Sequence, residues 1–232
     1  MNRCTTVLIL PILLTLLPIL AHSQVDTVKT FFEKGVLKDG YKVGVWEYYD
    51  APGILALKVD YNSAKLLFLK EDTSAYPIRS GNEWINSRLD VYPRYIGSMN
   101  EFYDILSTET LGKYLLQARG KRTVGTFYVL FQVDSLGSAG GFEVINDIGD
   151  GCSDIILEAM KKIPNYWLPA RKGAYSYTSR FILPVHFKII EDGREVKSKK
   201  KDKTAIDLPL AKELPEFVVT ATARNREHRT VK

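Results

Sequence analysis

The sequence predicts an α+β fold, in which a small antiparallel sheet packs on one or two helices and follows an all-β hairpin module. Apolar side chains alternate through residues 125–134, and a Gly/Ser-rich turn comes directly after them. This pattern is typical of a half-buried strand that enters a hairpin. After Gly151 the apolar period lengthens from two residues to three and four, which indicates a helix.

Residues 1–23 have the features of a secretory signal peptide. Arg3 is their only charged side chain, residues 7–21 are almost wholly apolar, and Ala21-His22-Ser23 fits a cleavage site. We expect cleavage before Gln24 and a location in the periplasm or cell envelope. The alternative is an inner-membrane anchor through residues 7–21, although a membrane span needs roughly 20 apolar residues.

Composition excludes several classes of protein. Most of the formal net charge of +5 lies in residues 191–232, so no broad basic face for nucleic acid is expected. Cys4 belongs to the predicted signal peptide, which leaves Cys152 alone in the mature chain. A single cysteine cannot form an internal disulfide framework.

Residues 24–75 read as a β-hairpin module. Turn residues separate alternating apolar runs at 43–49 and 54–61. The pattern G-x-K-x-G-x-W-x-Y-Y-D-x-x-G-x-L begins at Gly40 and resembles the MORN-like repeats of YwqK-type proteins. Residues 76–92 lose this periodicity and are predicted to be a polar linker, with a domain boundary near residue 90.

The next region, residues 93–190, is predicted to contain two helices and three strands. Ser98 and Glu101 fit a capping box at the start of the first helix, which we expect to pause at 107–110. The second helix should start at Ser153 or Asp154 and stop at Pro164. The last strand runs from about 177 to 190 and contains Pro184, which favours an edge position because proline has no N–H to donate.

Several separated motifs in residues 93–190 resemble one family. In order they are P-R-Y-I-G, K-Y-x-x-Q-A-R, G-T-F-Y-V-L-F-Q-V-D-x-x-G, I-G-x-G-C, W-x-P-A-x-x-x-G and L-P-V-H-F. Together they are similar to the TonB C-terminal domain in the form common in Bacteroidota. The resemblance implies a three-stranded antiparallel sheet on one or two helices. It also implies an open sheet edge that binds the TonB box, an extended segment of an outer-membrane transporter, by strand addition.

The partner-binding edge is expected on the last strand of this domain. An edge strand offers unpaired backbone groups, so pairing gives affinity with little demand on sequence. The expected edge residues are Arg180, Phe181, Ile182, Leu183, Val185, His186 and Phe187.

Residues 191–232 are predicted to be a disordered basic tail with one exception. Residues 213–223 look like a TonB box, with Glu216, Phe217, Val218, Val219, Thr220 and Ala221 as its central residues. We expect this segment to add to a sheet edge of its own domain, of a neighbour or of a TonB protein. The alternative is a disordered tail whose β-rich composition arose by chance.

No catalytic, cofactor-binding or metal-binding residues are predicted. His186 stands alone in a strand, and residues 149–151 favour a tight turn over an anion site. Cys152 is expected to fill a strand–helix corner, with a reactive thiol as the alternative. Trp46, Tyr48, Tyr49 and Trp84 are expected to stack in a core, with a peptide- or glycan-binding face as the alternative.

The sequence therefore predicts a non-enzymatic adaptor of TonB-dependent outer-membrane transport. Its partner would be a protein segment from a transporter or from the TonB system, with no cofactor and no small-molecule substrate. The family's Pro-rich spacer is missing, which argues against energy transduction. The alternatives are a membrane-anchored TonB-type energy transducer and an envelope structural protein that forms homodimers or larger oligomers.

Overall fold

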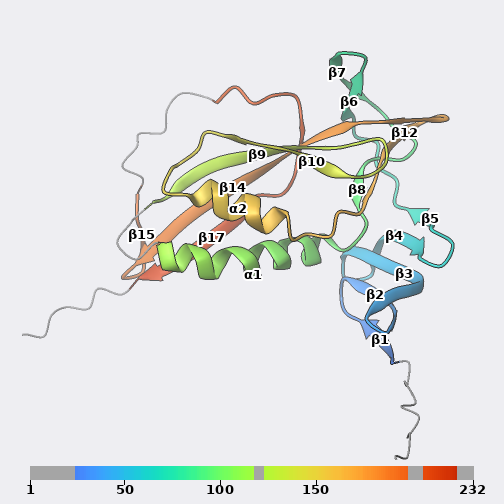
Figure 1. Cartoon of the computed structure of the whole chain (residues 1–232), viewed down its shortest axis with the longest axis horizontal. Coiled ribbons are helices and arrows are strands. Elements are labelled where there is room, and N and C mark those ends of the chain that lie inside the picture. Colours follow the sequence, from blue (N-terminus) through green and yellow to red (C-terminus); the bar gives the residue numbers. More distant parts are fainter. Residues whose placement is uncertain (1–23, 118–122, 198–205, 224–232) are drawn as a thin grey trace, which may run out of the picture.

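The computed structural model describes residues 24–117, 123–197 and 206–223, which form two helices and seventeen strands (Figure 1). The predicted signal peptide and residues 198–205 and 224–232 of the predicted basic tail lie outside the described residues, as do Ala118 and Arg119 of the family motifs. In the described ranges, no helix combines the length and the apolar character that a membrane crossing requires.

Sheet A is a five-stranded antiparallel meander in which each strand pairs with its sequence neighbour. Its strands are β1 (Val25–Lys29), β2 (Glu33–Lys38), β3 (Tyr41–Ala51), β4 (Ile54–Asp60) and β5 (Lys65–Leu69). The hairpins predicted at 43–49 and 54–61 are β3 and β4. Trp46 and Tyr48 are buried in the core of this sheet, at 1% and 0% exposure, so they do not form an open binding face.

Sheet B has eight strands and centres on β14. Its strands are β6 (Tyr76–Ser80), β7 (Glu83–Ser87), β9 (Gly125–Val133), β10 (Ala139–Ile145), β14 (Ser179–Glu191), β15 (Arg194–Glu195), β16 (Lys212–Glu213) and β17 (Phe217–Ala223). Two short pairs complete the β structure: β8 (Arg94–Tyr95) with β11 (Trp167–Leu168), and β12 (Ala170–Lys172) with β13 (Tyr175–Tyr177).

Two helices cover one face of sheet B, α1 (Met99–Gln117) and α2 (Cys152–Met160) (Figure 1). The Ser98 hydroxyl accepts a hydrogen bond from the Glu101 N–H at 3.0 Å, which confirms this half of the predicted capping box. The predicted pause at 107–110 is wrong, because α1 is continuous there. α2 starts at Cys152, earlier than expected, with Gly151 as its N-cap in the left-handed conformation.

The predicted three-stranded sheet is wrong. The structure is mostly β, and its larger sheet has eight strands. The cause is the length of β14, whose thirteen residues present a long second edge of backbone groups that would otherwise be unpaired. Segments outside residues 93–190 pair with this edge. The predicted linker contains the β6–β7 hairpin, β16 starts in the predicted disordered tail, and β17 lies within residues 213–223, the segment that was expected to add to a sheet edge.

The edge position predicted from Pro184 is also wrong, since β14 is paired on both sides. The Ile182 carbonyl accepts a hydrogen bond from the Leu214 N–H at 2.9 Å, so residue 182 directs its backbone groups toward the tail. Pro184 lies two positions further on and faces the same way. It falls between β16, which ends opposite Ile182, and β17, which begins opposite Val185. The missing N–H therefore coincides with a break in the ladder.

Candidate functional site

The candidate site is the second edge of β14, defined as the backbone edge of residues 179–191 that lies opposite β9. On the first edge, β9 pairs antiparallel with β14 through nine residues. On the second edge, β6 pairs at Ser179, β16 pairs with residues 181–182, and β17 pairs with residues 185–191. The tail strands run parallel to β14, and the seven paired residues of β17 cover the longest part of this edge.

The side chains of β17 alternate between the core and solvent. Phe217, Val219 and Ala221 point into the core beneath α1, with exposed fractions of 7%, 4% and 5%. Val218 and Thr220 are on the solvent side, where Val218 is 40% exposed. β17 thus contributes three apolar side chains to the core of sheet B while its other face stays open to water.

Tyr103 of α1 holds the start of β17. Its ring stacks on Phe217 with a centroid separation of 6.1 Å and an interplanar angle of 28°. Its hydroxyl donates a hydrogen bond of 2.7 Å to the Pro215 carbonyl. The hydroxyl is protonated at neutral pH and can donate, and burial raises the pKa of Tyr103 further above its usual value. Figure 1 shows β17 lying between α1 and β14.

The remaining contacts of β17 come from the backbone and from apolar burial. Among the described residues, Glu213 and Glu216 form no ion pair and the β17 side chains form no hydrogen bond. Backbone pairing needs no particular side chain, whereas the buried face requires apolar groups at every second position. The second edge of β14 is therefore suited to any extended segment with that alternation.

The structure brings the two sets of sequence-predicted site residues together. Val185 pairs with Phe217, His186 with Val218, and Phe187 with Val219. The other predicted edge residues, Arg180, Phe181, Ile182 and Leu183, belong to the same strand, where β6 and β16 share the second edge. Glu216 directly precedes β17.

Two polar residues of β14, His186 and Arg180, have local partners on the face away from the helices. His186 Nδ1 lies 2.8 Å from the Thr126 hydroxyl in a hydrogen bond, and its Nε2 lies 3.8 Å from Glu195. The Arg180 guanidinium stacks 3.9 Å from the centroid of the Trp84 ring. These contacts give His186 and Arg180 packing roles and place neither in a catalytic arrangement.

Sequence reasoning missed three parts of this site. Residues 188–191 extend the ladder beyond Phe187. Tyr103 was not among the predicted site residues, and the apolar face at helical spacing through Phe102 and Ile105 does not include it. Lys212 of β16 belongs to the predicted disordered basic tail, yet its ammonium lies 4.4 Å from the centroid of the Tyr76 ring on β6. A scan for aromatic residues near Lys212 in sequence would not have found Tyr76.

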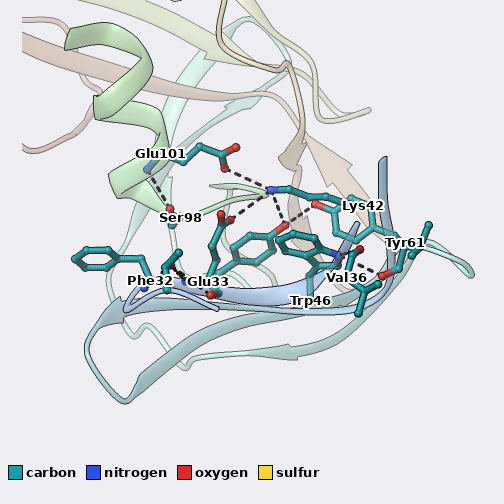
Figure 2. Close-up of polar contacts among 11 residues, drawn as sticks. Phe32, Glu33, Val36, Lys42, Trp46, Tyr61, Ser98 and Glu101 are labelled. Atoms are coloured by element: carbon teal, nitrogen blue, oxygen red, sulfur yellow. Dashed lines mark hydrogen bonds and ion pairs between the residues drawn. The ribbon is translucent and has the colours of Figure 1, made fainter. Parts of the chain in front are cut away.

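A second polar arrangement lies where sheet A meets α1 (Figure 2). The Lys42 ammonium is 3.5 Å from both Glu33 and Glu101, and it donates to the Tyr48 hydroxyl at 3.3 Å. It also lies 4.6 Å from the centroid of the Trp46 ring. Burial raises the pKa of Glu101, and the charge of Lys42 opposes this shift. Glu101 thus connects the start of α1 to sheet A.

A cleft with a volume of about 680 Å³ lies beside this cluster, between sheet A and the helix-bearing part of the chain. Tyr41, Tyr61 and Tyr95 line it together with aliphatic side chains and two prolines. Near the cleft, Arg94 forms an ion pair of 3.0 Å with Asp50 and joins the two parts of the chain a second time. These contacts fix sheet A against the domain that contains β14.

The other candidates from the sequence have structural explanations. Cys152 is 2% exposed and belongs to the core cluster of sheet B. Gly149, Asp150 and Gly151 all have positive φ and form the tight turn before α2. Within the described ranges, no group of three or more His, Cys, Asp or Glu side chains is arranged to hold a metal ion.

Comparisons with known proteins do not identify this chain. No family model matches it, and neither the curated proteins nor the solved structures contain a match.

Proposed function

We propose that this chain is a periplasmic binding or adaptor protein of TonB-dependent outer-membrane transport. It recognises an extended protein segment, the TonB box of a transporter, by β-strand addition at the second edge of β14. The single observation that carries the proposal is the pairing of β17 with residues 185–191, because β17 has the sequence of a TonB-box-like segment.

Two features support strand addition as the mode of binding. The second edge pairs with a parallel strand along seven residues, and alternate side chains of that strand lie in the apolar core beneath α1. Strand addition to a sheet edge is a recurring mode of peptide recognition, in which backbone pairing provides affinity and the sites for alternate side chains provide selectivity. The ordered family motifs of residues 93–190 support a partner from the TonB system.

In this role the chain is not an enzyme and is exported to the periplasm. An anchored energy transducer would need residues 1–23 to remain on the chain. Intact mass or N-terminal sequencing of the protein from cells tests this, since a start at Gln24 would exclude the anchor. Retention of residues 1–23 would favour the transducer.

Binding is tested with a labelled peptide that carries the N-terminal box of a TonB-dependent transporter. The protein is the full chain with Phe217→Asp and Val219→Asp. These substitutions replace two buried apolar side chains of β17 with charged ones, so that β17 leaves the second edge of β14. We expect saturable binding by fluorescence anisotropy, and competition by an unlabelled peptide of residues 213–223, ELPEFVVTATA.

The matched control is the same competitor with aspartate in place of Phe217 and Val219, which should not compete. An absence of transporter-peptide binding up to millimolar protein would reject the proposed function. It would leave an envelope structural protein as the alternative, which analytical ultracentrifugation of the full chain would then examine.

A further inference from the structure

We propose that β17 is a displaceable internal ligand, so that the chain carries in cis the kind of segment its own sheet edge accepts. This inference rests on the proposed function and adds the partner's sequence class and the regulation of the site. A partner must present a parallel strand with a large apolar side chain, then an aliphatic one, then a small one, at alternate positions. It must also displace β17 from residues 185–191 of β14.

The sequence class follows from the three buried positions of β17. The first holds Phe217, whose ring is stacked on Tyr103. The second and third hold Val219 and Ala221, both at most 5% exposed. Side chains at the two intervening positions are free to vary, because they face solvent. A charged residue at a buried position would lose its hydration without gaining a partner.

The boundary of the displaceable part lies at residues 214–216. β16 precedes it and is held by Lys212 against the Tyr76 ring and by the hydrogen bond from Leu214 to Ile182. β17 follows it and is held by backbone pairing, three apolar side chains and the contact of Tyr103. The break in the ladder opposite Pro184 separates the two segments. β17 can therefore leave the edge while β16 stays in place.

Displacement has a measurable consequence for affinity. A segment tethered within the same chain acts at an effective concentration of order millimolar. A partner peptide binds only the fraction of molecules whose edge is open, so its apparent affinity falls by that fraction. If the isolated β17 segment binds the edge with an intrinsic Kd of roughly 10 μM, we expect closure by β17 to weaken binding of a partner peptide on the order of 100-fold.

The closing experiment locks β17 in place with a disulfide. Lys188 and Thr220 are paired in the register, and both side chains lie on the solvent face of the sheet. Adjacent strands are about 4.8 Å apart, a separation that a disulfide can span. In the full chain with Lys188→Cys and Thr220→Cys, oxidation should abolish binding of the labelled transporter peptide, and reduction should restore it to the level of the unlocked chain.

Two control variants and one variant with an open edge define the result. The full chain with Tyr128→Cys and Ile145→Cys places a disulfide between β9 and β10, away from the second edge, and its peptide binding should not respond to oxidation. The chain with Val218→Asp and Thr220→Asp should bind like the unmodified chain. The chain with Phe217→Asp and Val219→Asp should bind about 100-fold more tightly.

Other outcomes would overturn the inference. Equal peptide binding by the oxidised and reduced forms would reject displacement and would show that the peptide binds outside residues 185–191, although recognition of the transporter segment by the chain would stand. A disulfide-linked dimer on a non-reducing gel would show that β17 pairs in trans with a second copy. An absence of binding by the reduced protein and by the Phe217→Asp/Val219→Asp chain would reject the proposed function itself.

Discussion

Sheets A and B are assembled in opposite ways. In sheet A, every strand from β1 to β5 pairs with its neighbour in sequence, and the side facing α1 holds the ion cluster around Lys42. In sheet B, β14 pairs with strands from residues 76–80, 125–133 and 217–223, and the side facing the helices is apolar. One sheet is built from local hairpins and the other around a shared strand.

This difference separates a fixed part of the molecule from an exchangeable one. Hairpin strands are joined by short turns, so they lose little entropy when they pair. β17 reaches β14 through a much longer connection, so its pairing has a larger entropy cost. Segments of a protein can open locally at free energies below that of global unfolding. We therefore expect the first edge of β14 to unfold with the domain and the second edge to open by itself.

The largest effect should come from the first edge. Phe131 on β9 is fully buried, and its ring packs against Phe181, Phe142 and Trp167 at centroid separations of 5.5 to 5.8 Å. Phe131→Ala should lower the free energy of unfolding by about 3–5 kcal/mol, measured by urea denaturation. Leu136→Ala is the control, because Leu136 is 88% exposed. A loss of unfolding free energy no larger than that of Leu136→Ala would contradict the conclusion that the first edge of β14 unfolds with the domain.

The stability of sheet A should fall when a single methyl group is added at Gly35. A Cβ at Gly35 would lie 2.2 Å from the Trp46 ring, which is itself 1% exposed. Gly35→Ala should therefore destabilise sheet A by about 1–3 kcal/mol through overpacking. Gly112→Ala in α1 is the matched control with opposite sign, since nothing lies within 4 Å and alanine favours a helix. Equal stability of the two variants would argue against tight packing at Trp46.

A smaller and local effect is expected at the second edge. Phe217→Ala removes the ring that stacks on Tyr103, but its cost is limited because β17 can detach without unfolding the domain. Amide exchange of residues 217–223 should accelerate by about 10- to 100-fold, equivalent to about 1.4–2.8 kcal/mol. Val218→Ala, at a 40% exposed position, should change exchange little. A loss of global stability as large as that of Phe131→Ala would remove the distinction between the two edges.

The local parts of this structure were predictable and the distant pairings were not. Alternation and turn residues located β3, β4 and β9, since each pattern lies within one short stretch. Alternation in residues 217–223 also shows which side chains are buried, but it does not specify which edge the strand joins or that the pairing is parallel. The Glu101 carboxylate was expected at the backbone of Ser98, and it lies beside Lys42 of sheet A instead. No local pattern encodes that proximity.

The smallest effect should be a pH dependence at the junction of the two sheets. Burial raises the pKa of Glu101 above its unfolded value of 4.5, despite the opposing charge of Lys42. A carboxyl group with a raised pKa binds its proton more tightly in the folded state, so its contribution is complete below pH 4.5 and is lost as pH rises through the folded pKa. The stability of the unmodified chain relative to Glu101→Gln should therefore increase as pH falls from 7 toward 4.5.

Because Glu101 is partly exposed, we expect this change in the free energy of unfolding to be only a few tenths of a kcal/mol, measured by urea denaturation at a series of pH values. A difference that increases toward high pH would mean that attraction to Lys42 outweighs burial, and that the junction is held by charge.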